Sequence, residues 1–511
     1  MLEFSEKNIK KYYSKIKSLA FKSLYNNELE NSLNLIETAA RLAYSINWIY
    51  TDSELESMLS TISAKILPIG TINSPIKGRY VFYDYFASDN KCLTQQYIRA
   101  LISWDIEFLY LLEGDDQKNS TRIMQELKMY PKVEIYALPN KYSKVEKIKK
   151  AYNKIADYRP EKIFMQLHPA DVIAVSTLIA FPEVTKYQIN LTDHAFWLGV
   201  NITDYSLEFR NYGCTVSIEK RGINKNKLLV QPFYPITDCD SFKGLPPEVT
   251  PEKTIIFSGG SYYKIYGEDS SYFHILKQLL DENPSVIIVY AGGGNEKPFR
   301  QFIIENNFNN RLFLIGNRTD INHIFSMCDI YLGTFPAAGG LMSQFAAING
   351  KPILAYNKTN IPGNFIEDFL SNGEYGNKSL GYTDLDELMI YSKELINNKE
   401  FRENEGKIIK SRVIDPTIFS ENLHELITSN TNKKKINLIG IDYNKFCETY
   451  IVAENKFNNS FPLFFARRFG LLSIILFPKA GIKFSIEICS NKVEFWKFIK
   501  TVFRNLMKKN M

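Results

Sequence analysis

The chain has 511 residues, of which 45% are hydrophobic and 23% are charged. This composition is ordinary for a soluble globular protein, and the length is too great for one core, so we expect two or three domains. No apolar run approaches the roughly 20 residues of a membrane-spanning helix, and the polar first residues do not resemble a secretory signal. We therefore expect neither an integral membrane protein nor a secreted one.

The spacing of the cysteines and the distribution of charge indicate the cellular location and the kind of partner to expect. The six cysteines, at positions 92, 214, 239, 328, 447 and 489, match neither a disulfide framework nor a metal site, which favours a reduced, cytoplasmic location. The net charge is +6, but the segment from Thr431 onward contains fifteen Lys and Arg and only five Asp and Glu. The tail thus carries +10 and the remainder −4, so we expect no nucleic-acid partner.

The first region, residues 1–75, is predicted to be helical. Between Ser5 and Leu67 apolar residues recur at a spacing of about 3.6 residues, most clearly from Leu29 to Leu42. We expect a small helical cap in front of the first sheet.

From Arg79 the pattern alternates between strands and helices, as in a parallel, doubly wound sheet. This assigns residues 76–234 to a first Rossmann-like domain. A helix is predicted at 94–101, and strands are predicted at 80–83, 107–112, 133–137, 163–167, 186–190 and 215–218.

A segment rich in Pro and acidic residues, 235–253, is predicted to be a linker to a second Rossmann-like domain, 254–430. Residues 431–511 form an extension beyond it. The predicted fold class is thus α/β, with two Rossmann-like domains facing a cleft. Strands of the second domain are predicted at 254–257, 286–290, 312–315, 330–332 and 352–355, with a helix at 272–280.

The stretch from Cys328 to Tyr356 combines a strand, a glycine turn and a helix. Gly339 and Gly340 stand where a helix begins, and free backbone N–H groups at such a place suit a phosphate. A tight strand-to-helix turn without a ligand explains the same glycines. No GxGxxG follows the first strand of either half, which disfavours NAD and FAD.

Other polar or glycine-rich loops also follow predicted strands. In open α/β sheets ligands bind beyond the carboxyl ends of the strands, so such loops are candidates for the site. These loops are His168-Pro169, Thr192-Asp193-His194, Ser258-Gly259-Gly260, and Gly316-Asn317-Arg318.

The order of these features resembles the GT-B glycosyltransferases, in particular the bacterial enzymes that build surface polysaccharides from sugar nucleotides. The resemblance covers about residues 79–427 and is most specific over LFLIGNRTDINHIFSMCDIYLGTFPAAGGLMSQFAAINGKPIL. It implies that the C-terminal domain binds a nucleotide-diphosphate sugar and the N-terminal domain binds a saccharide or lipid-linked saccharide acceptor. It also implies activity without a cofactor or a catalytic metal.

The resemblance also implies roles for residues on the donor side. The turn at Ala338, Gly339 and Gly340, with the loop at Gly259 and Gly260, would face the diphosphate. Asn317 and Arg318 would lie beside the base. Lys264 would neutralise a phosphate, although a solvated loop lysine is an equal expectation.

One departure from the family's pattern concerns the helix after the turn. Many members place a carboxylate there for the ribose or the donor sugar, whereas this chain has Gln344. An amide hydrogen-bonds a hydroxyl but is not a charged partner. The donor and the stereochemical outcome therefore stay open.

Sugar transfer requires that the acceptor hydroxyl lose a proton, which points to His168, Asp193 and His194 as candidate catalytic residues. Asp193 would act as the base or orient His194. Packed, structural histidines are the alternative. No DxD stands convincingly at a strand end, and the one at Asp238 and Asp240 falls in the linker, so no metal site is predicted.

Two other functions remain open: a sugar-nucleotide epimerase of the same fold, and an inactive nucleotide-sugar-binding protein. The tail adds a further question. Residues 461–477 are apolar but too short to span a bilayer. Residues 493–507 are predicted to form a basic amphipathic helix, which binds an anionic membrane at its inner face or packs on the N-terminal domain.

Overall fold

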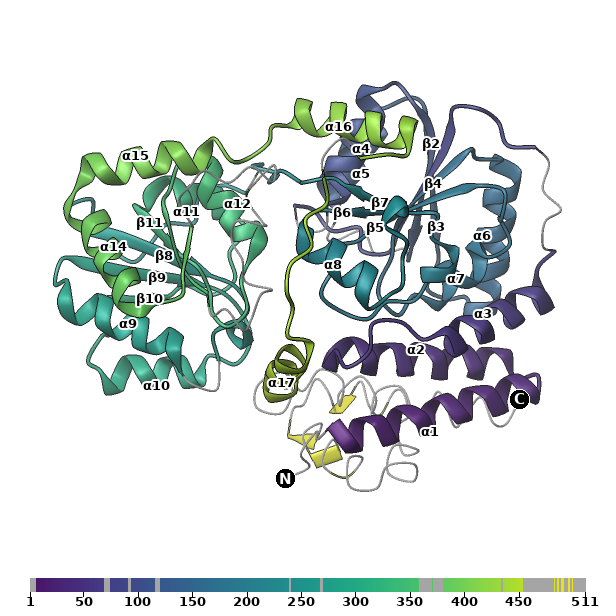
Figure 1. Ribbon diagram of the computed structural model, residues 1–511, viewed down its shortest axis with the longest axis horizontal. Coiled ribbons are helices and arrows are strands. Elements are labelled where there is room, and N and C mark those ends of the chain that lie inside the picture. Colours follow the sequence, from purple (N-terminus) through teal and green to yellow (C-terminus); the bar gives the residue numbers. More distant parts are fainter. Residues whose placement is uncertain are drawn as a thin grey trace.

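The computed structural model describes residues 6–68, 74–90, 93–114, 120–238, 240–266, 270–357, 370, 380–432 and 435–453, with isolated residues between 482 and 499. Two α/β domains lie side by side, and the N-terminal helices pack against one end of the N-terminal domain (Figure 1). Within these described residues, no helix is both long enough and apolar enough to cross a membrane.

A parallel sheet of seven strands forms the centre of the N-terminal domain, in the order β3-β2-β1-β4-β5-β6-β7. Its strands are β1 (Arg79–Asp84), β2 (Glu107–Glu113), β3 (Val133–Leu138), β4 (Lys162–Gln166), β5 (Thr185–Ile189), β6 (Tyr205–Glu208) and β7 (Leu228–Val230). Its helices are α4 (Thr94–Ser103), α5 (Thr121–Lys128), α6 (Lys144–Tyr158), α7 (Val172–Leu178), α8 (Asn211–Glu219), and the short η1 (Val200–Ile202) and η2 (Lys225–Lys227).

One predicted strand of this domain is wrong. Residues 215–218 lie in α8, and the outer strands β6 and β7 were not predicted. Thr215, Val216 and Ile218 favour strands by their β-branched side chains. In the structure, however, Thr215 and Val216 are buried on a helix that packs beside β6 and β7. Tertiary packing therefore overrides the local preference.

The C-terminal domain holds a parallel sheet of six strands in the order β10-β9-β8-β11-β12-β13. Its strands are β8 (Thr254–Gly259), β9 (Val286–Ala291), β10 (Leu312–Leu314), β11 (Ile330–Leu332), β12 (Ile353–Tyr356) and β13 (Gly381–Tyr382). Its helices are η3 (Tyr262–Ile265), α9 (Ser271–Glu282), α10 (Lys297–Glu305), α11 (Ile321–Met327), α12 (Gly340–Ile348), α14 (Leu385–Asn397) and α15 (Lys399–Lys410). The predicted pair of Rossmann-like domains is confirmed.

The N-terminal region is helical, as predicted, and consists of α1 (Glu6–Tyr25), α2 (Leu29–Ile46) and α3 (Ser53–Ile66). It is not a separate cap, because its apolar residues share one hydrophobic cluster with β1, β2, β4 and α7. The buried carboxylate of Glu56 on α3 also accepts the backbone N–H groups of Gly199, Val200 and Asn201. The helices and the first sheet therefore form one body.

The chain returns to the N-terminal domain after α15. The helix α16 (Pro416–Ser429) packs against α4, where Trp104 Nε1 donates to Ser420 Oγ over 2.9 Å. Asn432 then hydrogen-bonds the edge strand β7 at Leu228 and Val230. In sequence order α16 belongs to the second domain, but by packing it belongs to the first.

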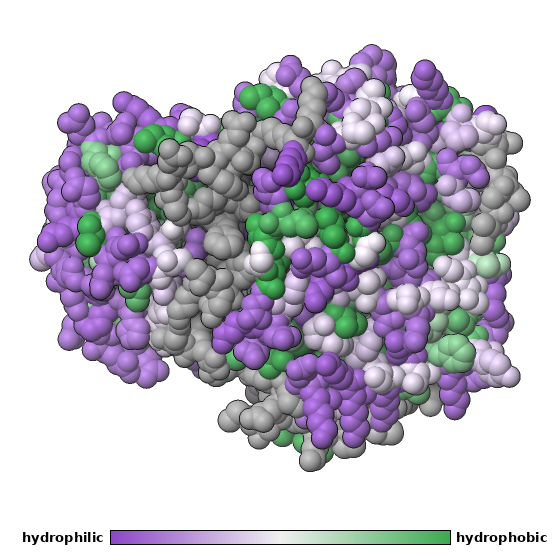
Figure 2. Space-filling model, in the orientation of Figure 1, coloured by the Kyte–Doolittle hydropathy of each residue, from purple (hydrophilic) through white to green (hydrophobic). Residues whose placement is uncertain are grey.

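Residues 435–453 of the predicted extension run along α8 and end in α17 (Tyr443–Ala453), which lies beside α2 (Figure 1). The predicted amphipathic helix at 493–507 lies mostly outside the described residues, and the apolar stretch at 461–477 lies entirely outside them. Phe495 and Ile499 are described, and they pack against the cluster of the N-terminal helices, whereas Trp496 is 63% exposed. On the face shown in Figure 2, apolar side chains gather more over the N-terminal domain than over the C-terminal one.

Candidate functional site

The loop after β5 holds the predicted pair Asp193 and His194. Asp193 is buried and forms an ion pair with Arg210, whose Nη2 lies 3.1 Å from Oδ1. Burial raises the pKa of Asp193, but the charge and hydrogen bonds of Arg210 and His194 outweigh it and hold the pKa at about 2. Asp193 Oδ1 lies 3.3 Å from Nδ1 of His194. The ionised carboxylate therefore orients the ring and directs Nε2 of His194 away from itself.

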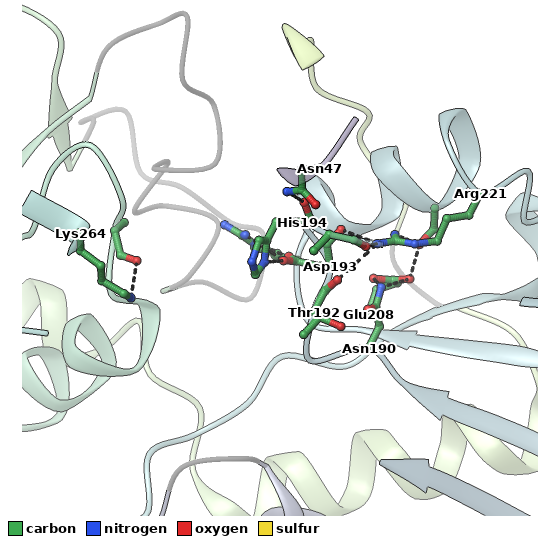
Figure 3. Close-up of polar contacts among 12 residues, drawn as sticks. Asn47, Asn190, Thr192, Asp193, His194, Glu208, Arg221 and Lys264 are labelled. Carbon is green, nitrogen blue, oxygen red and sulfur yellow. Dashed lines mark hydrogen bonds and ion pairs between the residues drawn. The ribbon is translucent and has the colours of Figure 1, made fainter. Parts of the chain in front are cut away.

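A buried guanidinium holds this loop in place (Figure 3). Arg221 Nη2 donates to the carbonyl oxygens of Thr192, Asp193 and Ala195, the second of these over 3.0 Å. The guanidinium also lies over the ring of Trp197, at 5.1 Å from its centroid. Because these carbonyl oxygens all accept hydrogen bonds from one rigid, planar guanidinium, the backbone of residues 192–195 is held in a single conformation.

Behind the loop lies the carboxylate of Glu208 at the end of β6. It accepts hydrogen bonds from Asn190, Ser206 and Ser217, and Ser217 in turn accepts one from Arg221. Packing is tight here, because a Cβ on Gly213 would lie 2.5 Å from Oε2 of Glu208 and 3.0 Å from Cβ of Asp193. The position of Asp193 therefore depends on a glycine in α8.

His168 lies in the loop after β4, and its two ring nitrogens have different surroundings. Nδ1 accepts the backbone N–H of Ala170 over 3.0 Å, so the neutral ring carries its proton on Nε2. Burial, helped by the charge of Arg41, lowers the pKa of His168 to about 3. The ring is thus neutral and has no nitrogen ready to accept a proton. In this tautomer Nε2 of His168 is a donor, and a catalytic role for His168 stays a prediction.

On the C-terminal domain, Lys264 lies against the turn that precedes α12. Its Nζ donates to the carbonyl oxygen of Ala338 over 3.2 Å, and its own carbonyl accepts the N–H of Ala337. Burial lowers the pKa of Lys264. Gly339 is the N-cap of α12 and Gly340 is its first residue. The structure therefore brings Lys264, Ala338, Gly339 and Gly340 together.

Glycines let the neighbouring loops of this sheet approach one another. A Cβ on Gly259 would lie 2.8 Å from the carbonyl oxygen of Ala291, and one on Gly293 would lie 2.6 Å from Nδ2 of Asn317. Gly260 lies beside the stem of Lys264. Asn317 is thus part of the same group of loops as the predicted phosphate turn.

Arg318 and Gln344 were also predicted to bind the donor nucleotide sugar. The guanidinium of Arg318 pairs with both carboxylate oxygens of Asp320 and donates to the carbonyl oxygen of Gly244 over 2.9 Å. These bonds connect the linker to the loop before α11, and the predicted place of Arg318 beside the base stays a prediction. Gln344 is buried in α12, with 3% of its surface exposed. Among the described residues, no group of three or more His, Cys, Asp or Glu side chains is arranged to hold a metal ion.

The helix α17 joins the two sides of the site. The ring of Tyr450 lies 6.1 Å from that of His194, and Phe446 belongs to the same hydrophobic cluster as Tyr262 of the C-terminal domain. Burial raises the pKa of Tyr450, and the nearby hydroxyl of Tyr263 raises it further. Figure 3 shows Lys264 of the C-terminal domain on the left and His194 of the N-terminal domain near the centre.

Several residues of this site had no sequence signal of their own. Arg210 and Arg221 are ordinary basic residues until the fold buries them, and Tyr450 lies in a segment that the sequence places outside both domains. The residues that sequence reasoning missed are Arg41, Asn47, Glu208, Arg210, Gly213, Arg221 and Tyr450.

No protein family and no curated protein is matched by the sequence. In structure, the chain is similar to HepE of Anabaena, solved with UDP and glucose, at a TM-score of 0.51 and 15% identity, over 69% of this chain and 99% of that chain. It is also similar to an O-GlcNAc transferase variant of Thermobaculum terrenum, at a TM-score of 0.50 and 10% identity, over 86% and 82%. For a putative UDP-N-acetylglucosamine 2-epimerase of Listeria monocytogenes the TM-score is 0.46, at 11% identity over 72% of this chain and 99% of that chain. At such identities a likeness establishes the architecture alone, and that architecture is the GT-B fold.

Proposed function

We propose that the chain is a glycosyltransferase that moves a sugar from a nucleotide-diphosphate sugar to an acceptor hydroxyl. The observation that carries the proposal is the arrangement of His194. Its side chain is 31% exposed, its Nδ1 lies 3.3 Å from the ionised Asp193, and Lys264 of the other domain lies across from it in Figure 3. A base and a phosphate turn on facing domains are what displacement at an anomeric carbon requires.

In the proposed reaction, His194 Nε2 takes the proton of the acceptor hydroxyl as its oxygen bonds to the anomeric carbon. Asp193 stabilises the imidazolium that results. The bond from the anomeric carbon to the diphosphate oxygen breaks, and the leaving group keeps the electron pair. Backbone N–H groups at the start of α12 and the ammonium of Lys264 offset the new negative charge, so the proposal includes no catalytic metal.

We also propose an acceptor and a location for the enzyme. A saccharide or lipid-linked saccharide acceptor, used in the synthesis of a cell-surface polysaccharide or glycoconjugate, fits the GT-B fold with a basic tail. A cytoplasmic enzyme held at the inner face of the membrane by that tail would meet such an acceptor. HepE was solved with UDP and glucose, which makes UDP-sugars the first donors to test.

The test begins with full-length protein and a panel of UDP-sugars, with and without a mixture of saccharide acceptors. A transferase releases UDP much faster when an acceptor is present. An epimerase converts the sugar nucleotide without an acceptor, and a binding protein shows a thermal shift but no turnover. Either of the last two results would replace the proposal.

A pair of histidine variants links the activity to the site. His194→Ala should bind UDP normally and lose about two to four orders of magnitude in transfer rate, since the general base is gone. His323→Ala is the matched control, because His323 is an exposed histidine on α11. Equal rates for both variants and the wild type would show that the acceptor is activated elsewhere.

A further inference from the structure

The helix α17 contacts both halves of the molecule. Cys447 belongs to the hydrophobic cluster of the N-terminal helices, Ile451 packs against that cluster, and α17 lies beside α2. Phe446 belongs to a second cluster, whose other buried residues all come from the C-terminal domain, and Tyr450 packs against it. Figure 1 shows α17 at the place where these parts meet. A segment beyond both Rossmann-like domains therefore joins them.

Tyr450 of this helix covers one face of the His194 ring. The two ring centroids lie 6.1 Å apart, and the ring planes differ by 23°. Nearly parallel rings at this distance are offset, an arrangement that attracts aromatic rings beyond the area that they bury. Asp193 holds only one atom of the imidazole, Nδ1 at 3.3 Å, so with this contact alone the side chain is able to change rotamer. A second ring packed against the imidazole opposes that change.

Phe446, one helical turn before Tyr450, supports the other member of the pair. Its ring lies 6.1 Å from the ring of Tyr212, and the guanidinium carbon of Arg210 lies 4.5 Å from the centroid of Tyr212. Arg210 in turn forms the ion pair with Asp193. Phe446 and Tyr450 also contact each other edge to face, at 5.1 Å. Both Asp193 and the ring beside it are thus packed, directly or through Arg210, against aromatic side chains that α17 contacts.

Tyr450 also lies near a residue of the donor side. Burial raises the pKa of Tyr450, and it raises the pKa of Tyr44 on α2 to about 12; the nearby hydroxyl of Tyr263 raises both further. Tyr263 precedes Lys264 in η3. Tyrosines of α2, α17 and the C-terminal domain therefore meet beside the proposed base, at the junction of the two domains.

We propose that Tyr450 is a positioning residue of the active site, whose ring holds the imidazole of His194 with Nδ1 on Asp193 and Nε2 toward the acceptor hydroxyl. This inference rests on the proposed function, because it concerns the base of that reaction. It makes α17 a part of the catalytic site. Tyr450 acts through His194 and takes no part in the bond changes. Loss of its ring therefore lowers the fraction of His194 in the productive orientation and leaves the donor affinity unchanged.

The kinetic test uses full-length variants with the UDP-sugar and the saccharide acceptor that the wild type uses fastest. Tyr450→Leu removes the ring and keeps an apolar side chain, so kcat should fall about three- to tenfold while the KM of both substrates stays unchanged. Tyr450→Phe keeps the ring and should retain the wild-type kcat. A Tyr450→Phe protein as slow as Tyr450→Leu would assign the effect to the hydroxyl and overturn the proposal. A wild-type or higher kcat in Tyr450→Leu would also overturn it, because the ring would then give no support or would block the base.

Tyr443→Leu is the matched control, because it removes a tyrosine ring from the same helix. The ring of Tyr443 lies 5.7 Å from that of Tyr50, and its hydroxyl donates to Glu219 over 2.7 Å. This variant should lower the melting temperature at least as much as Tyr450→Leu and keep the wild-type kcat. An equal fall in kcat for both variants would show a general loosening of α17 and would remove the positioning role. If Tyr450→Leu does not fold, Tyr450→Met takes its place.

Histidine NMR separates this inference from the proposed function, since it needs no turnover. The chain has five histidines, and the His194 signals are those missing from the spectrum of His194→Ala. At a pH of about 8.5, above the ordinary pKa of histidine, the wild type should show one His194 tautomer, with its proton on Nδ1 toward Asp193. Tyr450→Leu should show a mixture of tautomers, and Tyr450→Phe should keep the wild-type pattern.

The NMR outcomes decide the two proposals independently. Unchanged His194 signals in Tyr450→Leu would overturn the positioning role whether or not the protein transfers a sugar. The expected signals in a protein that transfers no sugar would keep the role of Tyr450 in orienting His194 and would remove the transferase.

Discussion

Asn47, the residue that ends α2, donates a hydrogen bond of 2.6 Å from its side-chain amide to the backbone carbonyl of His194. Asn47 has a left-handed backbone, with φ of 61°, so its amide reaches past the end of the helix. The N-terminal helices therefore contact the backbone of the residue that we propose as the base. Removing this contact should affect catalysis without touching the donor side.

Asn47→Gly tests this contact, because glycine tolerates the left-handed backbone and removes only the amide. The lost hydrogen bond of about 1 kcal/mol should lower the transfer rate roughly fivefold through a less ordered His194. UDP affinity should stay unchanged. The measurement is transfer at saturating donor, with UDP affinity by calorimetry, and an unchanged rate would show that the loop keeps its place without Asn47.

The ion pair of Asp193 and Arg210 predicts an acid-sensitive stability. The folded pKa of Asp193, about 2, lies below the ordinary value of about 3.9. A lowered folded pKa stabilises the protein at pH values above the ordinary one, and this stability is lost as the pH falls from about 4 to about 2. Urea unfolding of the wild type over this range should show the loss.

Asp193→Asn should remove that part of the acid dependence and lower the stability at neutral pH. It leaves Arg210 buried without its carboxylate, at a cost of about 3–5 kcal/mol. His323→Ala, an exposed position on α11 away from the ion pair, is the control and should unfold like the wild type. An Asp193→Asn protein of wild-type stability would contradict the account.

We expect a side chain at position 213 to displace Asp193. A Cβ there would lie 2.5 Å from Glu208 and 3.0 Å from Asp193, so Gly213→Ala should lower the stability by about 1–3 kcal/mol and slow transfer. Gly440→Ala is the matched control, because no heavy atom beyond its chain neighbours lies within 4 Å of that position. Thermal unfolding and the transfer rate measure both variants. Equal melting temperatures would mean that α8 shifts at little cost.

Lys264 predicts the strength of diphosphate binding. Lys264→Met keeps the stem and removes the ammonium, so UDP affinity should fall about tenfold by the loss of a charged donor. The control is Lys297→Met, which changes an exposed lysine on α10 of the same domain. Gly340→Val should abolish UDP binding more completely, since its side chain would block the backbone at the start of α12. Wild-type affinity in both site variants would move the diphosphate elsewhere.

The tail predicts an association with anionic membranes. Full-length protein should float with anionic liposomes at low salt and less so at high salt, because surface charges are screened. A protein that ends after Ala453 should not float with the liposomes and should stay at the bottom of the gradient. The cut lies there because Ile436, Phe446 and Cys447 are buried in the folded body, so ending the chain near Asn430 would remove part of the core. If neither protein floats, the tail only packs on the N-terminal helices, as Phe495 and Ile499 do.

The sequence by itself determined the parts of this protein that follow from local periodicity. Buried parallel strands such as β1 and β9 are continuous apolar runs, and glycine turns such as Gly339-Gly340 punctuate them, so ten of the eleven predicted strands are present. The order of these elements along the chain was enough to predict two Rossmann-like domains. Loops at the carboxyl ends of strands then indicated Asp193 and His194 as candidates, and the resemblance to the GT-B family indicated Lys264.

Only the tertiary structure decided what those candidates are able to do. The tautomer of His168 depends on the backbone N–H of Ala170, and the charge of Asp193 depends on Arg210, which is buried beside it by the packing of α8. α16 and α17 return to the first domain from the far end of the chain, and Arg41 and Tyr450 reach the site from segments placed outside both domains. Periodicity indicates which face of an element is apolar but not which distant element covers that face. The hydrogen-bond partners and pKa values of the site residues depend on this tertiary packing.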